Sequence, residues 1–266
     1  MASWVAPGCE NGRAMNDAAP TLTPQTRLDS EADRPNPTEA TLAPQAVLWD
    51  FDGTLADTEP LWIAAEFAVI EEELGAPWSM DHAERLVGSD LIEAATYMLD
   101  TIGRNDLEPA WMVSRILQRV VDEVTGSEEL AWRPGALTLL AELRAADIPC
   151  ALVSASYRVL LDAVLERLPA DSFTVSVGGD EVTLGKPHPE PYEKACALLG
   201  VEPAQCVVLE DSITGARAGN AAGAVVVGIP NIVDIPPAKR RVIVPSLLDL
   251  DVASLSAICA TVNRAQ

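Results

Sequence analysis

The stretch AVLWDFDGTLADTEP, residues 46–60, joins a short apolar run to two carboxylates, Asp50 and Asp52, that are one residue apart. Continuous apolarity over so few residues is typical of a strand that is buried on both faces. Two neighbouring carboxylates at the end of such a strand repel each other unless a cation or a proton relieves the repulsion. The stretch therefore predicts a buried parallel sheet with a charged site at its edge.

Further short apolar runs and helical patterns alternate in the second half of the chain. The apolar runs are at 148–153, 173–177, 205–209 and 224–229, and the helical patterns between them are at 156–168, 190–199 and 212–222. Alternation of buried strands with helices is typical of a parallel sheet covered by helices on both sides. The sequence therefore predicts an α/β fold with a doubly wound parallel sheet.

One interval interrupts this alternation, because about 100 residues separate the first apolar run from the second. The interval contains only helical patterns, at 59–74, 90–102, 108–125 and 135–146. The last of these can serve as the crossover back to the sheet, and the others predict an inserted α-helical subdomain. An insertion directly after the first strand lies above the carboxyl end of that strand, where it can cover the two aspartates.

These patterns predict three parts of the chain. Residues 1–44 contain six prolines and no sustained periodicity, so we expect a disordered N-terminal tail. We expect residues 45–61 and 131–266 to form the α/β core, and residues 62–130 to form a helical cap.

Composition restricts the partners that we expect. The chain has a net charge of −22, which disfavours binding to nucleic acid and to anionic membranes. It has no apolar run of the length of a membrane span, and its N-terminal residues have no apolar stretch typical of a signal peptide. Its five cysteines are far apart and form no CxxC pair. We therefore expect a reduced, cytoplasmic protein, a monomer or weak homodimer, whose partner is a small molecule.

Polar residues follow the predicted strands at the points where the strands end. They are Asp50 and Asp52 after the first strand, Ser154 after the second, Lys186 in the loop after the third, and Glu210 and Asp211 after the fourth. The carboxyl ends of parallel strands meet at one edge of a sheet, which is where such folds bind ligands. Carboxylate oxygens in this number indicate Mg²⁺, and the lysine and the hydroxyl offer donors to anionic oxygens.

Each of these features also has a purely structural interpretation. Asp50 to Gly53 can be a turn after a strand, and Ser154 can be the N-cap of the helix predicted from residue 156. Lys186 can be a solvated loop lysine, and the segment 210–212 can simply cap the helix that follows it. The placement of all of them at strand ends, in this order, favours a common site.

Four segments in order carry a resemblance to a known family. They are DFDGT at 50–54, VSAS at 153–156, GKPHPEPY at 185–192 and LEDS at 209–212. Over about residues 45–250 the sequence resembles the haloacid dehalogenase-like hydrolase superfamily, specifically its phosphatase branch with a helical cap inserted after the first motif. The resemblance implies a Mg²⁺-dependent hydrolase that acts on a small phosphorylated metabolite.

The resemblance also implies a role for each motif residue. Asp50 would be the nucleophile that forms an aspartyl-phosphate, and Asp52 would protonate the leaving oxygen and later deprotonate water. The phosphoryl oxygens would be bound by Ser154, Ala155 and Lys186. The metal ligands would be Asp50, Asp52 through its backbone carbonyl, Glu210 and Asp211, with Glu210 acting directly or through water.

Three other outcomes remain open at this point. Dehalogenases of the superfamily use the same nucleophile without metal, but they lack a second aspartate like Asp52. Sugar-phosphate mutases of the β-phosphoglucomutase type share the DFDG and SAS segments, but they usually carry a histidine where this chain has Trp62, and basic residues around a cap loop near a glycine. A non-catalytic binding protein is the third outcome, and the presence of every motif residue that turnover needs argues against it.

The cap contacts are the least determined part of the site. The segment DTEPLW at 57–62 looks like that of phosphatases acting on small hexose or hexitol phosphates. Glu59 could accept hydrogen bonds from substrate hydroxyls, and Arg85 or Ser89 could reach the substrate from the cap. Glu59 can instead be a first-turn acid that favours a helix dipole, and Arg85 can be a solvated helix residue. We expect the tryptophans of the cap and its junctions to be packing residues: Trp62, Trp78, Trp111 and Trp132.

Overall fold

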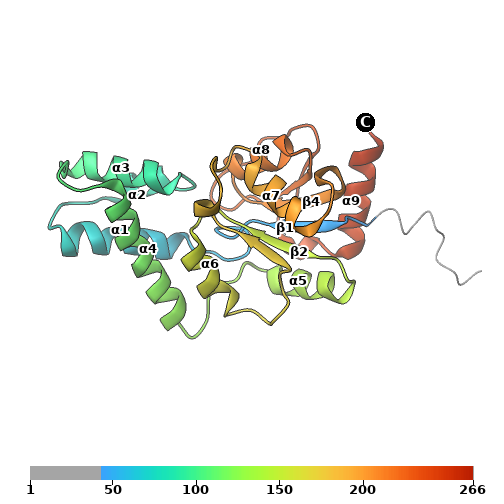
Figure 1. Ribbon diagram of the computed structural model, residues 1–266, viewed down its shortest axis with the longest axis horizontal. Coiled ribbons are helices and arrows are strands. Elements are labelled where there is room, and N and C mark those ends of the chain that lie inside the picture. Colours follow the sequence, from blue (N-terminus) through green and yellow to red (C-terminus); the bar gives the residue numbers. More distant parts are fainter. Residues whose placement is uncertain (1–42, 266) are drawn as a thin grey trace, which may run out of the picture. The chain divides into compact units, whose positions relative to one another are not determined.

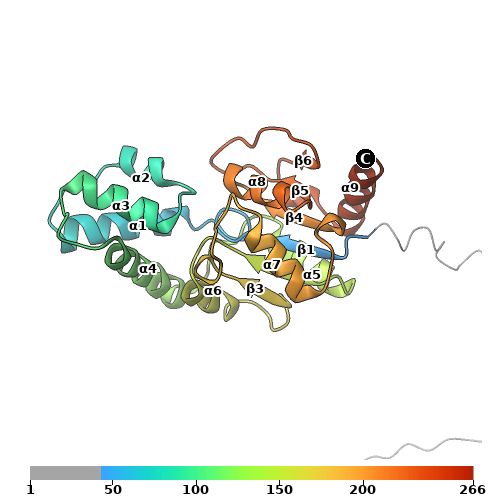
Figure 2. The same ribbon diagram turned by 45° about the horizontal axis from the view of Figure 1, so that its top comes forward.

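A computed structural model describes residues 43–265 of the chain, and its centre is a sheet of parallel strands (Figures 1 and 2). The strands are β1 (Ala46–Trp49), β2 (Cys150–Val153), β3 (Val175–Val177), β4 (Cys206–Glu210), β5 (Val225–Gly228) and β6 (Arg241–Ile243). Their order in the sheet is β3-β2-β1-β4-β5-β6, and every neighbouring pair is parallel. The carboxyl ends of β1, β2 and β4 therefore lie side by side at one edge.

Helices cover both faces of this sheet, as the continuous apolar runs predict. Alternate residues of β1 point to opposite faces: Val47 and Trp49 belong to one buried cluster, and Ala46 and Leu48 belong to another. The helices of the first cluster are α5 (Ala136–Ala145), α6 (Arg158–Leu165) and α9 (Val252–Arg264), and those of the second are α7 (Glu190–Leu199) and α8 (Ile213–Ala221). The doubly wound α/β fold is confirmed.

The long interval between β1 and β2 is helical, as its periodicity predicts. Its helices before the crossover helix α5 are α1 (Glu59–Phe67), a π-helical segment (Ala68–Glu73), α2 (Met80–Leu86), α3 (Leu91–Ile102) and α4 (Pro109–Gly126). Local signals set some of their ends: the Asp90 side chain accepts from the amides of Ile92 and Glu93 at the start of α3, and Gly103 ends this helix with a φ of 70°.

Two backbone hydrogen bonds join the segment that leaves the core to the segment that returns to it. The amide of Asp57 donates to the carbonyl of Ala131 at 2.7 Å, and the amide of Arg133 donates to the carbonyl of Leu55 at 3.0 Å. The two connections therefore run together. All described residues belong to one compact unit, Pro37–Gln266, and the division into core and cap at 62 and 130 stays a prediction.

Three elements were not predicted from the sequence. Strand β6 has only three residues, each of them intermediate or exposed, so it lacks the apolar run of a buried strand. Helix α2 is also short, and α9 lies beyond the segment that the motifs cover. The predicted tail, residues 1–44, lies almost entirely outside the described residues. Among residues 43–265, no helix combines the length and the apolarity needed to cross a lipid bilayer.

Candidate active site

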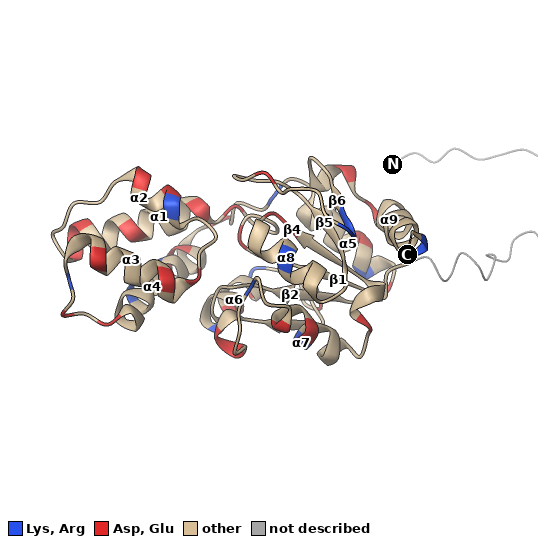
Figure 3. Cartoon of the chain, turned by 90° about the horizontal axis from the view of Figure 1, so that it is seen from above, with Lys and Arg blue, Asp and Glu red and all other residues tan. Residues whose placement is uncertain are grey.

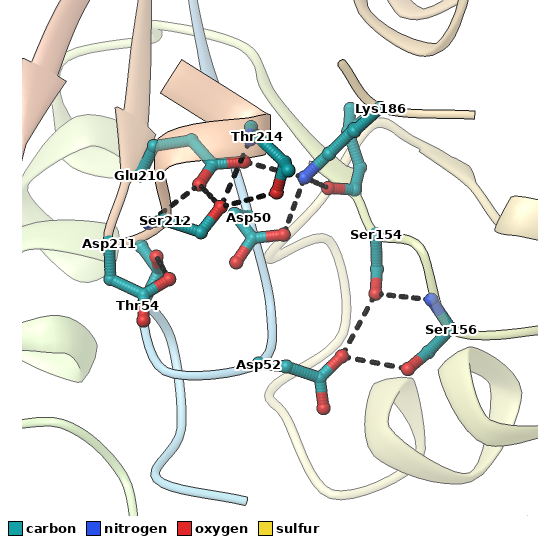
Figure 4. A network of polar contacts seen from close by, with 12 residues as sticks. Asp50, Asp52, Thr54, Ser154, Ser156, Lys186, Glu210, Asp211, Ser212 and Thr214 are labelled. Carbon is teal, nitrogen blue, oxygen red and sulfur yellow. Dashed lines mark hydrogen bonds and ion pairs between the residues drawn. The ribbon is translucent and has the colours of Figure 1, made fainter. Parts of the chain in front are cut away.

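The ammonium group of Lys186 connects two acids at the edge of the sheet (Figure 4). Its Nζ lies 2.5 Å from Oδ1 of Asp50 and 2.7 Å from Oε1 of Glu210, and it donates to the carbonyl of Val153 at 2.9 Å. The Lys186 side chain is only 6% exposed, so the interpretation as a solvated loop lysine is wrong. Burial alone would lower the pKa of Lys186, but the carboxylates of Asp50 and Glu210 raise it.

Three buried acids gather around this lysine. Asp50, Glu210 and Asp211 each present a carboxylate oxygen, and these oxygens lie within 4.8 Å of one another. Burial and the charge of Glu210 raise the pKa of Asp50 well above its ordinary value. The same two causes raise the pKa of Asp211 to about 7. The cluster carries more negative charge than Lys186 neutralises, and a divalent cation bound by carboxylate oxygens would relieve the excess. The residues present therefore fit a Mg²⁺ ion.

Glu210 is held by protein donors on both of its oxygens. Oε1 accepts from Lys186 and from the hydroxyl of Tyr192 at 2.7 Å, and Oε2 accepts from the hydroxyl of Ser212 at 2.8 Å. A Cβ atom on Gly215 would lie 1.6 Å from Oε1, so only glycine leaves room for this carboxylate. Protein donors thus engage both oxygens of Glu210. Its carboxylate is therefore better placed to orient Lys186 than to bind a metal ion directly.

Asp211 is positioned by a second close approach. Its Oδ1 accepts a hydrogen bond from the hydroxyl of Thr54 at 3.0 Å. A Cβ atom on Gly53 would lie 2.1 Å from Oδ2 of Asp211, and Gly53 has a φ of 85°, which favours glycine. The segment 53–54 therefore fixes the position of Asp211 relative to Asp50.

The carboxylate of Asp52 turns away from this cluster and accepts four hydrogen bonds. Oδ1 accepts from the hydroxyl of Thr58 at 2.7 Å and from the indole of Trp62 at 2.9 Å. Oδ2 accepts from the hydroxyls of Ser154 at 3.1 Å and Ser156 at 2.7 Å. The N-cap and one helical residue of α1, together with two residues after β2, thus fix one side chain, and Figure 4 shows Asp52 with the two serines.

Two interpretations of these residues need correction. Ser154 is not the N-cap of a helix, because α6 begins at Arg158 after Tyr157, and the Ser154 hydroxyl instead bonds to Asp52 and to the amide of Ser156. Trp62 is not solely a packing residue. The interpretation of segment 210–212 as a cap holds in part, since the Ser212 hydroxyl accepts from the amide of Gly215 at the start of α8.

Sequence reasoning missed Thr58, Trp62 and Ser156 as neighbours of Asp52. The threonine and the tryptophan of the DTEPLW segment, and the second serine of VSAS, were the only available signals. Neither spacing determines that both segments converge on one carboxylate.

A cavity of about 230 Å³ opens beside these residues. Of the residues expected in the site, Asp50, Asp52, Ala155 and Lys186 line it, as do Glu59 and Ser89 from the helical insertion. Ser154 is buried behind the lining. Arg85 does not line the cavity: it is exposed, with its guanidinium 5.1 Å from the ring centre of Tyr97. This position agrees with the interpretation of Arg85 as a surface helix residue.

Comparison with known proteins identifies the family of the chain. The model of the family described as haloacid dehalogenase-like hydrolase matches residues 47–229. A phosphorylated carbohydrates phosphatase of Thermotoga maritima is 32% identical over 67% of this chain and 82% of its own. Hexitol phosphatase B of Escherichia coli is 31% identical over 66% of this chain and 79% of its own.

A longer relative and a solved structure are also similar. The bifunctional riboflavin kinase/FMN phosphatase of Arabidopsis thaliana is 31% identical over 70% of this chain, and the match spans only 48% of that enzyme. The crystal structure of a variant of CbbY from Rhodobacter sphaeroides in complex with xylulose-(1,5)bisphosphate superimposes with a TM-score of 0.72 at 29% identity, covering 80% of this chain and 99% of that one.

Proposed function

Because the chain belongs to the haloacid dehalogenase-like hydrolase family, we propose that it is a Mg²⁺-dependent phosphatase that hydrolyses a small phosphorylated sugar or polyol through an aspartyl-phosphate. The observation that carries the proposal is the contact of Asp50 with Lys186 at the mouth of a cavity, beside Asp211 and Asp52. Phosphoryl transfer depends mainly on positioning and on charge stabilisation, and this arrangement supplies both.

In the first step, a carboxylate oxygen of Asp50 attacks phosphorus and the bond from phosphorus to the ester oxygen breaks. Asp52, in its protonated form, gives its proton to the departing alkoxide. Lys186 stays ionised because two carboxylates face it, so it offsets the repulsion between Asp50 and the incoming phosphate. Its ammonium and the backbone amide of Ala155, which lines the cavity, would bind the phosphoryl oxygens, and the Ser154 hydroxyl would join them on leaving its contact with Asp52.

In the second step, water attacks the phosphorus of the aspartyl-phosphate and Asp52 takes its proton. The bond from Asp50 to phosphorus breaks, so free phosphate and the original carboxylate result. The four donors that hold Asp52 keep one side chain in place for both proton transfers. Asp50 and Asp211, with the backbone carbonyl of Asp52, would hold Mg²⁺, and the ion when bound neutralises phosphoryl charge.

The relatives' names support the substrate class. One acts on phosphorylated carbohydrates and another on hexitol phosphates. Two observations argue for hydrolysis over mutase activity: Trp62 occupies the position of the usual mutase histidine and bonds to Asp52, and Arg85 lies outside the cavity. Helices α1–α4 would act as the cap, and the enzyme would work as a cytoplasmic protein.

Chemical trapping tests the covalent step. Borohydride reduces an acyl phosphate to an alcohol, so protein quenched during turnover with a hexitol phosphate should contain homoserine at position 50, detected by peptide mass spectrometry. Protein quenched without substrate serves as the control. Steady phosphate release with no reduced residue at position 50 would contradict the aspartyl-phosphate.

A further inference from the structure

Acids outnumber bases in the lining of the cavity, and Figure 3 shows the same excess of acids on the helices of the insertion. The charged residues that line the cavity are Asp50, Asp52, Glu59, Glu66, Asp90 and Lys186. Within the described part of the chain, Lys186 is thus the only cation in the lining, and it is already paired with Asp50 and Glu210. The half formed by the helical insertion contributes three acids and no base.

Among these acids, Glu66 is buried and has one carboxylate oxygen without a donor among the described residues. It lies on α1, seven residues after Glu59, so the two side chains share one face of the helix about 10 Å apart along its axis. Glu66 is only 6% exposed. Its Oε2 accepts from the indole of Trp78 at 3.1 Å, and no donor to its Oε1 occurs among residues 43–265. A buried carboxylate with a free oxygen in a cavity lining offers an acceptor to whatever enters.

The rest of this half is apolar. Leu91, Ala94, Ala95 and Met98 of α3 line it, together with Val113 and Ile116 of α4. Apolar walls weaken the screening of the two glutamates by water, so their charge acts strongly on a ligand. Burial also raises the pKa of both Glu59 and Glu66 to about 7, and in Glu66 the charge of Glu59 adds to the effect, so both groups carry their full charge only above this pH. Within residues 43–265, neither glutamate forms an ion pair with a lysine or an arginine.

We infer that this half of the cavity selects the alcohol part of the substrate: it accepts a hydrogen-bond-donating group without negative charge and excludes a second phosphate or a carboxylate, with Glu66 as a specificity-determining residue. The inference rests on the proposed phosphatase function. Hydroxyl or ammonium protons would donate to Glu66 and Glu59, whereas a second anion would meet two carboxylates and no base. The chain would thus differ in preference from the related CbbY, whose variant was crystallised with a bisphosphate.

Matched substrates test the exclusion. We compare kcat/KM at pH 8, where Glu59 and Glu66 are ionised, with Mg²⁺ present, for a hexitol monophosphate, the corresponding bisphosphate, an aldonic acid phosphate and an amino-hexose phosphate. The kcat/KM of the monophosphate should exceed that of the bisphosphate and that of the acid by about tenfold or more, because the two glutamates repel each added anion. The amino sugar distinguishes a cationic preference from a neutral one. Equal or higher kcat/KM for the bisphosphate would overturn the inference.

Removal of the negative charge of Glu66 tests its role in specificity. In Glu66→Gln, the ratio of monophosphate to bisphosphate kcat/KM should fall about tenfold, because the amide keeps an acceptor for Trp78 but carries no charge. Glu59→Gln should change the ratio in the same direction, which keeps the test available if the first variant does not fold. Glu72→Gln is the matched control, since Glu72 is 70% exposed and lies outside the cavity. An unchanged ratio in both cavity variants would overturn the assignment.

The test separates this inference from the proposed function. Hydrolysis of p-nitrophenyl phosphate, which carries one phosphate and an uncharged ring, reports whether the wild-type protein is a phosphatase. If this ester and all sugar esters resist hydrolysis, the proposed function fails. If they are hydrolysed without discrimination against the second anion, only the specificity inference fails.

Discussion

The indole Nε1 of Trp62 donates a hydrogen bond to Oδ1 of Asp52 across 2.9 Å. This contact joins a helix of the inserted segment to the residue that we propose to transfer protons. The hydroxyl of Thr58 approaches the same oxygen at 2.7 Å. The position of the proposed acid therefore depends on the insertion as well as on the sheet.

The contact predicts the effect of Trp62→Phe. The variant loses one of the four donors to Asp52 and keeps an aromatic ring, so we expect kcat to fall about tenfold with a small change in melting temperature. The kinetics of p-nitrophenyl phosphate hydrolysis measure it. Trp111→Phe is the control, because Trp111 packs against the core cluster without lining the cavity. Equal losses in the two variants would indicate a general packing effect.

Asp50→Asn tests the nucleophile. The amide has nearly the same shape as the carboxylate but does not attack phosphorus, so we expect kcat to fall by at least about a thousandfold. Circular dichroism should show an unchanged fold, since Lys186 keeps its contact with Glu210. Turnover near the wild-type rate would remove Asp50 from the mechanism.

Removal of divalent metal tests the acidic cluster. EDTA should abolish hydrolysis, and added Mg²⁺ should restore it. Because the ion binds the native state, saturating Mg²⁺ should raise the melting temperature by about 3 °C. In Asp211→Asn this increase should shrink, since one carboxylate of the cluster is lost. Undiminished turnover in EDTA, or an identical increase in the variant, would contradict the metal site.

Glu66 predicts how stability depends on pH. Its pKa in the folded protein is about 7, above its ordinary value of 4.5, so the native state holds a proton that the unfolded chain releases. This contribution is fully present below about pH 4.5 and is lost as the pH rises through 7. Glu66→Gln should therefore be more stable than the wild type at pH 8, by about 2 kcal/mol, and differ little at pH 4.5. Urea unfolding at the two pH values measures this, and a pH-independent difference would contradict it.

Gly215→Ala tests the contacts that hold the carboxylate of Glu210. The added methyl would lie 1.6 Å from Oε1 of Glu210, so the carboxylate must move and release Lys186 or Tyr192. We expect a loss of about 2 kcal/mol in unfolding free energy together with a large loss of activity. Gly126→Ala is the matched control, because a Cβ there meets no atom within 4 Å. Comparable destabilisation in the two variants would mean that helix propensity, and not the contacts of Glu210, explains the effect.

Strands β1 to β5 were predictable because each lies in a short apolar run, and every residue of β1, β2, β4 and β5 is buried. The order of polar residues after them was enough to bring Asp50, Lys186 and Glu210 to one edge. Strand β6 was not predictable in this way, since none of its three residues is buried, whereas the other edge strand, β3, buries Val177. Helix α9 carries a capping box at Asp251 and Ser254 that sequence reasoning did not use.

The contacts around Asp52 could not be predicted, for a different reason. Ser154 has the spacing of a helix cap, and only the direction of its side chain shows that it faces Asp52. Trp62 has the spacing of a packing residue on an amphipathic helix. Spacing determines which residues share a helix face, whereas the direction of that face depends on packing between elements distant in the chain.

The paired backbone at 55–57 and 131–133 has a consequence for how such proteins diversify. The helical insertion leaves the core and re-enters it at two neighbouring backbone hydrogen bonds. We therefore expect that a different helical module can replace it without breaking the hydrogen bonds between the parallel strands. Recombination at this junction, in nature or by design, would introduce a new preference for the alcohol, and the incoming module would have to supply donors to Asp52 in place of Thr58 and Trp62.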